Sequence, residues 1–379
     1  MIFARTMVMT AVLAARCLAG WCLAVLAATD TLAAITVNIV VPLSGSMVTD
    51  GATSETGMQL AVDAINARGG LLGQYLNLVV IDDGCDPEEA EAAADRAVAD
   101  HPKLVVGHYC SEASLRAAPI YARANILQIS PTATNPRLTE LGIRTVFRMI
   151  GRDDRQGMTA VDRIASRWAT GRIAVLDDGS VYARGLADTV RHGLTDRNVP
   201  IILNGGFAPN AAAYSDMVRA LADNRIEVLY LSGYSLDIGL LLREIGAAGL
   251  HIQVLGGDSL YPGDLVQTAG AAAEGLMFTM GPDVLHGPAA TPALVAARTR
   301  HETMTMTALQ TYAAVEAWAE AVRRARSFEP TPVAAALRGS PIPTVIGMVG
   351  FDEKGDILGP AGSWLWYRWH DGRAELESR

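Results

Sequence analysis

Short apolar runs alternate with helix-like segments from residue 35 onward. Several runs are apolar at consecutive positions, which is typical of parallel strands covered on both faces. They are TVNIVVPL (36–43), LNLVVID (76–82), KLVVGH (103–108), ILQIS (126–130), RTVFRMI (144–150), RIAVLD (172–177), IEVLYLSG (226–233) and IQVLGG (252–257). Strands and helices in alternation predict an open parallel α/β fold with helices on both faces of each sheet.

Two helices carry clear sequence signals. The first has an N-cap, a proline at the first helical position and a capping-box glutamate in DPEE (86–89). Small residues follow it at helical spacing, at Ala90, Ala93, Ala94 and Ala97. The second is predicted to be a core helix by an apolar stripe at Ala308, Tyr312, Val315, Ala319 and Val322.

The number of strand-like runs predicts two doubly wound lobes instead of one sheet. No Pro/Ser-rich linker divides them, so we expect them to be joined by short hinge strands. Ligands of such folds bind beyond the carboxyl ends of the strands. GHYCS (107–111) and SPTAT (130–134) both lie at such ends.

Residues 1–34 have the layout of a secretory signal peptide. Arg5 precedes a short apolar segment (18–28) and a group of small residues. The alternative is an uncleaved membrane anchor, but an apolar segment of that length is too short to span a bilayer at about 20 residues. We therefore expect an exported protein that does not span the membrane when mature.

Charge and cysteine content narrow the function further. The formal net charge is −9 and no basic run is present, which argues against a nucleic-acid partner. Removal of the signal peptide leaves Cys85 and Cys110, and an even pair in an exported protein favours a disulfide. A metal site is the weaker alternative, because none of the histidines stands at zinc-ligand spacing to either cysteine.

Catalytic motifs are nearly absent. The chain has no phosphate-binding GxxxxGK[ST], no GxGxxG after the first strand and no HExxH, and GDSLY (257–261) lacks the last glycine of a nucleophile elbow. We therefore predict no enzyme, no cofactor and no metal. Polar groups remain at strand ends, where each could also be a helix cap or a surface group: Ser111, Thr132, Thr134, Tyr182, Tyr234 and Asp258. A carboxylate at Ser111, which opens a helix, and an ammonium at Asp258 would hold a zwitterion.

Several motifs follow one another in an order that belongs to a known family. They are PLSG (42–45), INARGG (65–70), DDGCDPEEA (82–90), GHYCS (107–111), SPTATNPRLT (130–139), FR…D..QG (147–157), SGYSLDIG (232–239) and FDEKGD (351–356). In this order the chain resembles the periplasmic leucine/isoleucine/valine-binding proteins of ABC transporters, with the type I periplasmic-binding-protein fold. That fold implies two lobes joined by a three-segment hinge. We expect residues 35–152 plus 282–360 in the first lobe and 153–281 plus 361–379 in the second.

The resemblance implies a role for each polar group. Ser111 and Thr134 would hold the carboxylate of an amino acid, the Thr132 carbonyl and Asp258 its ammonium, and Tyr182 and Tyr234 would close over it. The resemblance also implies the Cys85–Cys110 disulfide. Two positions depart from the family, because Asp50 and Thr307 stand where leucine-binding members carry aromatic residues. We hypothesise a ligand with a more polar side chain than leucine; the alternative is that Asp50 points into solvent.

The resemblance implies a monomer in the periplasm that delivers an amino acid to ABC transporter permease subunits. That amino acid would be branched-chain or more polar. The alternatives are uptake of an amide, urea or aromatic acid, and ligand sensing for a membrane receptor.

Overall fold

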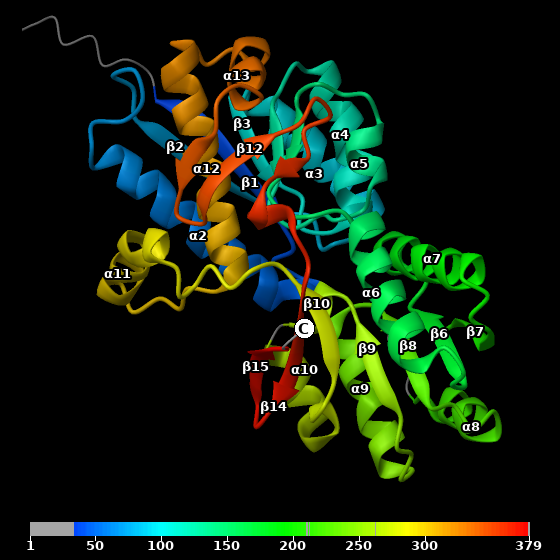
Figure 1. The fold of residues 1–379 in the computed structure, drawn as a ribbon. Helices are drawn as coiled ribbons and strands as arrows, with labels where there is room; N and C mark the ends of the chain where they lie inside the picture. Colours follow the sequence, from blue (N-terminus) through cyan, green and yellow to red (C-terminus); the bar gives the residue numbers. More distant parts are fainter. Residues whose placement is uncertain (1–33, 210, 212, 262, 378–379) are drawn as a thin grey trace, which may run out of the picture.

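The computed structural model describes residues 34–209, 211, 213–261 and 263–377. Residues 1–33 of the predicted signal peptide lie outside this part. The described chain forms two lobes (Figure 1). One contains the N-terminal segments in blue and cyan together with the yellow helix of residues 291–299 and the orange segments, and the other contains the green and the remaining yellow segments with the red C-terminal strands.

The first lobe is built on a sheet of five parallel strands in the order β2-β1-β3-β4-β5. Its strands are β1 (Ile35–Val41), β2 (Leu76–Asp82), β3 (Leu104–Gly107), β4 (Gln128–Ser130) and β5 (Val146–Arg148). Its helices are α2 (Val48–Asn66), α3 (Pro87–Ala99), α4 (Ser111–Arg123), α5 (Arg137–Glu140), α11 (Thr291–Thr299), α12 (Met306–Ala325) and α13 (Pro330–Leu337). Because side chains alternate along β1, Ile39 packs with α2 and α12, whereas Val40 packs with α3 and α4.

The second lobe is built on a sheet of seven strands in the order β15-β14-β10-β9-β8-β6-β7. These strands are β6 (Ile173–Asp177), β7 (Ile201–Gly206), β8 (Val228–Ser232), β9 (Gln253–Gly256), β10 (Met277–Met280), β14 (Leu365–His370) and β15 (Arg373–Leu376). Its helices are α6 (Asp153–Trp168), α7 (Val181–Asp196), α8 (Ser215–Asp223), α9 (Ser235–Ala247) and α10 (Gly263–Ala269). Strands β6 to β10 are parallel, and β14 pairs antiparallel with β10 (Figure 1).

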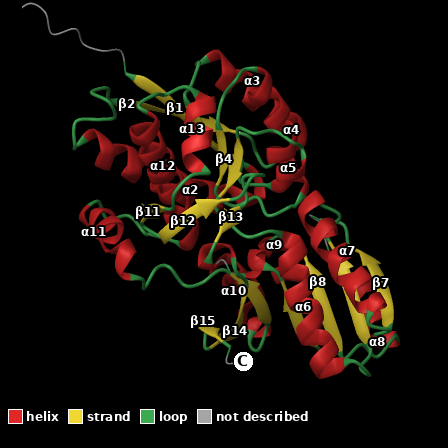
Figure 2. Ribbon diagram, turned by 45° about the horizontal axis from the view of Figure 1, so that its top comes forward, coloured by secondary structure: helices red, strands yellow, loops and turns green. Residues whose placement is uncertain are grey.

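A small antiparallel sheet completes the first lobe. It contains β11 (Ile342–Thr344), β12 (Gly347–Phe351) and β13 (Ile357–Leu358), and its buried side chains join the core around α12 (Figure 2). The chain passes between the two lobes three times: from β5 to α6, from β10 to α11 and from β13 to β14. The predicted α/β architecture of two lobes joined by three segments is therefore confirmed.

The sequence signals hold for most elements. Each of the eight apolar runs contains a strand, and the predicted alanine face of α3 and apolar stripe of α12 are buried. Asp86 caps α3 by accepting hydrogen bonds from the amides of Glu88 and Glu89 at 2.8 and 3.0 Å. The predicted capping box is wrong, because the amide of Asp86 donates to the Asp83 carbonyl at 3.0 Å instead of to Glu89.

Candidate functional site

Two loops of the first lobe meet because β3 and β4 are neighbouring parallel strands. The loop after β3 leads to Ser111 at the first turn of α4, and the loop after β4 carries Thr132 and Thr134. The Thr132 hydroxyl donates to the carbonyl of Tyr109 at 2.8 Å. The Ser111 hydroxyl accepts from the amide of Asn135 at 3.3 Å. The two loops are thus tied together, with the three predicted hydroxyl residues at one sheet edge.

Covalent and buried polar contacts hold this edge in place. Cys110 forms a disulfide with Cys85, as predicted, with 5.6 Å between the Cα atoms. On the other side, the fully buried Arg148 donates to the carbonyls of Ala133 and Asn135 at 2.8 and 3.0 Å. Arg148 also pairs with Asp356 at 2.6 Å, so its charge is compensated inside the lobe. These contacts fix the backbone on either side of Thr134.

The second lobe contributes a cluster around Asp258, which follows β9. The Asp258 carboxylate oxygen Oδ1 accepts from the Tyr182 hydroxyl and from the Gln156 amide, both at 3.0 Å. The ring of Tyr234 lies 5.6 Å from that of Tyr182, measured between centroids. The predicted residues Tyr182, Tyr234 and Asp258 are therefore neighbours in space, and Gln156 on α6 joins them.

The site is strongly acidic. Asp153, the first residue of α6, is fully buried, and burial together with the charge of Asp258 raises its pKa well above the ordinary value. The Thr134 hydroxyl lies near enough to lower that pKa somewhat, but neither carboxylate oxygen of Asp153 has a well-formed hydrogen bond. Burial also raises the pKa of Asp258, against the opposing effect of the bonds from Gln156 and Tyr182. Two carboxyl groups this poorly solvated favour a cationic group between the lobes.

One cavity joins the two sets of residues. Its volume, including the part that opens to solvent, is about 580 Å³. Seven of the eight predicted binding residues line it: Ser111, Thr132, Thr134, Tyr182, Tyr234, Asp258 and Thr307. No lysine, arginine or histidine is among the described residues of its lining.

Asp50 does not line this cavity. It lines an adjoining cavity together with Thr307, and at 9 % exposure it does not point into bulk solvent. The Tyr109 hydroxyl, which belongs to the first cavity, donates to the Asp50 carboxylate, and burial and this carboxylate raise the pKa of Tyr109. Asp50 is therefore linked to the first cavity by the hydrogen bond that it accepts from Tyr109.

Sequence reasoning gave no role to several residues of the site. Asp153 and Gln156 belong to the FR…D..QG motif, but their position under Asp258 needs the packing of α6 against β9 and β10. Gln310 was also missed, although it stands one helical turn after Thr307 and is buried among apolar residues of α12. A polar residue on the buried face of α12 was the available signal.

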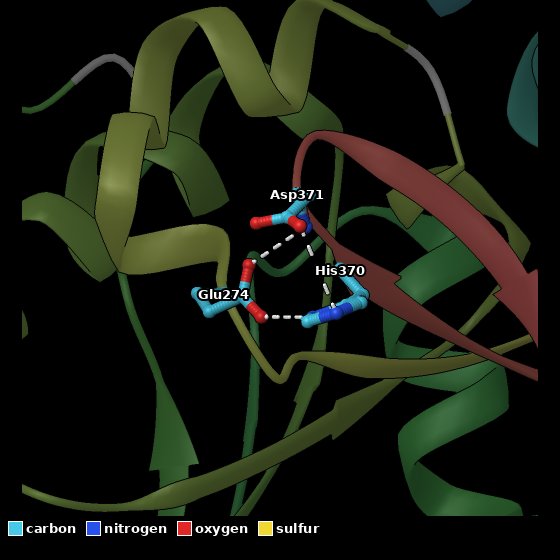
Figure 3. A group of neighbouring side chains, drawn as sticks. All are labelled: Glu274, His370 and Asp371. Atoms are coloured by element: carbon cyan, nitrogen blue, oxygen red, sulfur yellow. Dashed lines mark hydrogen bonds and ion pairs between the residues drawn. The ribbon is translucent and has the colours of Figure 1, made fainter.

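Glu274, His370 and Asp371 form a separate group where the turn between β14 and β15 meets the segment before β10 (Figure 3). Within the described residues it is the one set of three side chains whose ligand atoms lie within 4.8 Å of one another. All three are exposed, and Glu274 accepts from His370 at 2.7 Å and from the Asp371 amide at 3.1 Å. These bonds explain the arrangement, because Glu274 holds the turn between β14 and β15 in place.

The chain matches the family of periplasmic binding proteins over residues 34–368. The chain belongs to the periplasmic binding protein family. This family consists of binding proteins, and within the described residues no helix is long and apolar enough to cross a bilayer.

Individual relatives agree with this membership. The Leu/Ile/Val-binding protein homolog 1 of Brucella abortus is 34% identical over 89% of this chain and 91% of its own length. An ABC transporter substrate-binding protein of Desulfitobacterium hafniense, solved in complex with Leu, superposes with a TM-score of 0.73 at 26% identity and covers 90% of this chain and 99% of its own. A leucine-binding protein of Thermotoga maritima has the same fold, with a TM-score of 0.83 at 23% identity over 91% and 98% of the two chains.

Proposed function

We propose that this periplasmic binding protein captures an α-amino acid between its lobes and delivers it to the permease subunits of an ABC transporter. One observation carries the proposal: hydroxyl groups of the first lobe and a carboxylate–tyrosine cluster of the second line the same cavity. Such a site is complementary to a zwitterion. The names of the relatives, which refer to leucine, isoleucine and valine, support the same class of ligand.

Each end of the ligand has its own partners in this proposal. The carboxylate takes the hydroxyls of Ser111 and Thr134 and the free amides at the start of α4, where the helix dipole favours an anion. The ammonium takes the Thr132 carbonyl and Asp258, with the buried carboxyl group of Asp153 behind it. Charge-assisted hydrogen bonds of this kind are about twice as strong as neutral ones.

Lobe closure completes the binding. We assign residues 35–152 plus 282–360 to one lobe and 153–281 plus 361–379 to the other. A hydrogen bond of 3.0 Å from the Asn135 side chain to the Val181 carbonyl then bridges the lobes next to the site. Hinge motion would bring Tyr182 and Tyr234 onto a ligand already held by Ser111 and Thr134. The protein acts by capture and release, without covalent chemistry, cofactor or metal.

We further propose that the protein acts in the periplasm as a monomer, without a nucleic-acid partner. Its acidic composition supports the last point.

A calorimetric titration of the purified protein with the twenty amino acids tests the function. A thermal-shift screen that adds amides, urea and aromatic acids serves as the counter-test, because a bound ligand raises the melting temperature. Micromolar or tighter binding of at least one α-amino acid is the expected result. Binding confined to ligands without an ammonium group would overturn the proposal.

A further inference from the structure

Two cavities adjoin beside Thr307, near the start of α12. Both are lined by Tyr261, Met280 and Thr307. The second cavity, including its open side, measures about 1340 Å³ and runs between the start of α2, the segment before α12 and the β14–β15 hairpin. A ligand side chain that leaves the first cavity past Thr307 therefore has space ahead of it.

A buried amide stands at this junction. Gln310 is 6 % exposed, lines the first cavity and lies one helical turn from Thr307 on α12. Its side chain forms no hydrogen bond with any described residue, and neither does the hydroxyl of the half-buried Thr307. Buried polar groups in native proteins nearly always have a partner. Gln310 therefore points to a hydrogen-bonding partner inside the cavity, and Thr307 offers a second hydrogen-bonding group on the same wall.

The charge of the surroundings restricts that partner further. The acidic groups on the two cavities are Asp258, Asp50 and Asp283, and the fully buried Asp153 lies behind the first. The basic groups are both on the second cavity, where His286 is paired with Asp283 and Arg373 is exposed on the C-terminal hairpin. A ligand with an anionic side chain is disfavoured, because that side chain would lie beside Gln310 among these acidic groups without a cation next to it.

We infer that the ligand is an α-amino acid with an uncharged, hydrogen-bonding side chain longer than that of alanine, for which glutamine is the probe. This inference rests on the proposed function and deepens it. The Gln310 amide and the Thr307 hydroxyl each donate and accept, so together they match both atoms of a side-chain amide. A site built to hydrogen-bond a polar ligand rejects the apolar analogue because its own buried groups are then left unpaired.

The test compares glutamine, leucine and glutamate by calorimetry on the wild-type protein, Gln310→Leu and Thr307→Val. We expect wild type to bind glutamine at least tenfold tighter than leucine, a difference of about 1.4 kcal/mol, and tighter than glutamate. Gln310→Leu should reverse the preference towards leucine, and Thr307→Val should reduce it. Gln59→Leu on the exposed face of α2 is the matched control and should leave the preference unchanged.

The outcomes separate the two proposals. Leucine or glutamate binding as tightly as glutamine in wild type would overturn the side-chain inference, as would a preference that Gln310→Leu leaves unchanged. If leucine still binds and loses affinity in Asp258→Asn, the proposed function stands. If no α-amino acid binds the folded wild-type protein, both proposals fail. A melting curve for each variant shows that it is folded. Should Gln310→Leu not fold, an unchanged preference in Thr307→Val would overturn the inference in its place.

Discussion

Replacing Asp258 with asparagine should weaken amino-acid binding by removing one negative charge while keeping the shape of the side chain. The Asp258 oxygen that accepts from Gln156 and Tyr182 at 3.0 Å becomes an amide oxygen that can still accept both bonds. Truncating one partner of a buried, hydrogen-bonded charge pair costs about 2–5 kcal/mol. We expect about 2–3 kcal/mol, or a 30- to 150-fold rise in Kd, because Asp153 leaves a second carboxyl group nearby.

The assay is a calorimetric titration of both proteins with the tightest-binding amino acid found for wild type. Asp216→Asn is the matched control, because that side chain is 94% exposed on α8. A second measurement uses the ligand-free proteins. Burial and the charge of Asp258 both raise the pKa of Asp153, so removing that charge should raise the melting temperature without ligand and reduce the shift that the ligand causes.

A Kd within about threefold of wild type would refute the assignment of Asp258 to the ammonium, because the difference would be well below 1 kcal/mol. A lower melting temperature of ligand-free Asp258→Asn would contradict the repulsion between the two carboxyl groups.

Three further predictions concern pH, the disulfide and lobe closure. Because burial raises the pKa of Asp258 in the ligand-free protein, an ammonium must displace a proton from this carboxyl as the pH falls through that raised pKa. Affinity should therefore decline towards acidic pH and binding should release protons there, measured by calorimetry in buffers of different ionisation enthalpy; Asp258→Asn should show a flatter profile. Replacing Cys85 and Cys110 by serine opens a crosslink of sequence separation 25 and should cost about 3.5 kcal/mol of unfolding free energy in urea titrations. An unchanged midpoint would contradict this value. Asn135→Ala removes the bond to the Val181 carbonyl and should accelerate ligand dissociation about fivefold, for a net hydrogen bond of about 1 kcal/mol. Stopped-flow measurements check this, and a slower or equal rate would argue against a bridge between the lobes.

The strands that the sequence predicts well are those buried on both faces within long apolar runs; the four-residue β10 is also buried throughout but was not among the predicted runs. A continuous apolar run such as the one containing β8 has few other interpretations. Three strands lack a continuous apolar run. β7 has alternating burial at the edge of its sheet, and β14 and β15 form an antiparallel hairpin that contains polar residues. The N-cap of α3 was predictable because its signal is local. The partner of the Asp86 amide was not, because the turn at Asp83 competes with Glu89.

For the site, the sequence was enough to predict which loops meet, because the carboxyl ends of parallel strands lie at the same edge of a sheet. It did not tell which residues lie beneath the loops. Asp153 acts on the site through its burial, and burial depends on how α6 packs under Asp258. Gln310 is likewise recognised as a site residue only because α12 forms part of the cavity wall. The prediction for Asp50 placed it in the side-chain pocket, whereas the structure puts Tyr109 between the two.

The pairing of β14 with β10 closes one edge of the second lobe with residues that lie far along the chain. Strand β10 comes well before residues 365–370, which cover its free edge. Until β14 pairs with it, β10 presents an unpaired strand edge, which is a template for association with other chains. A truncation that removes only the C-terminal hairpin leaves this edge open, so it should yield an aggregating product instead of a smaller folded one.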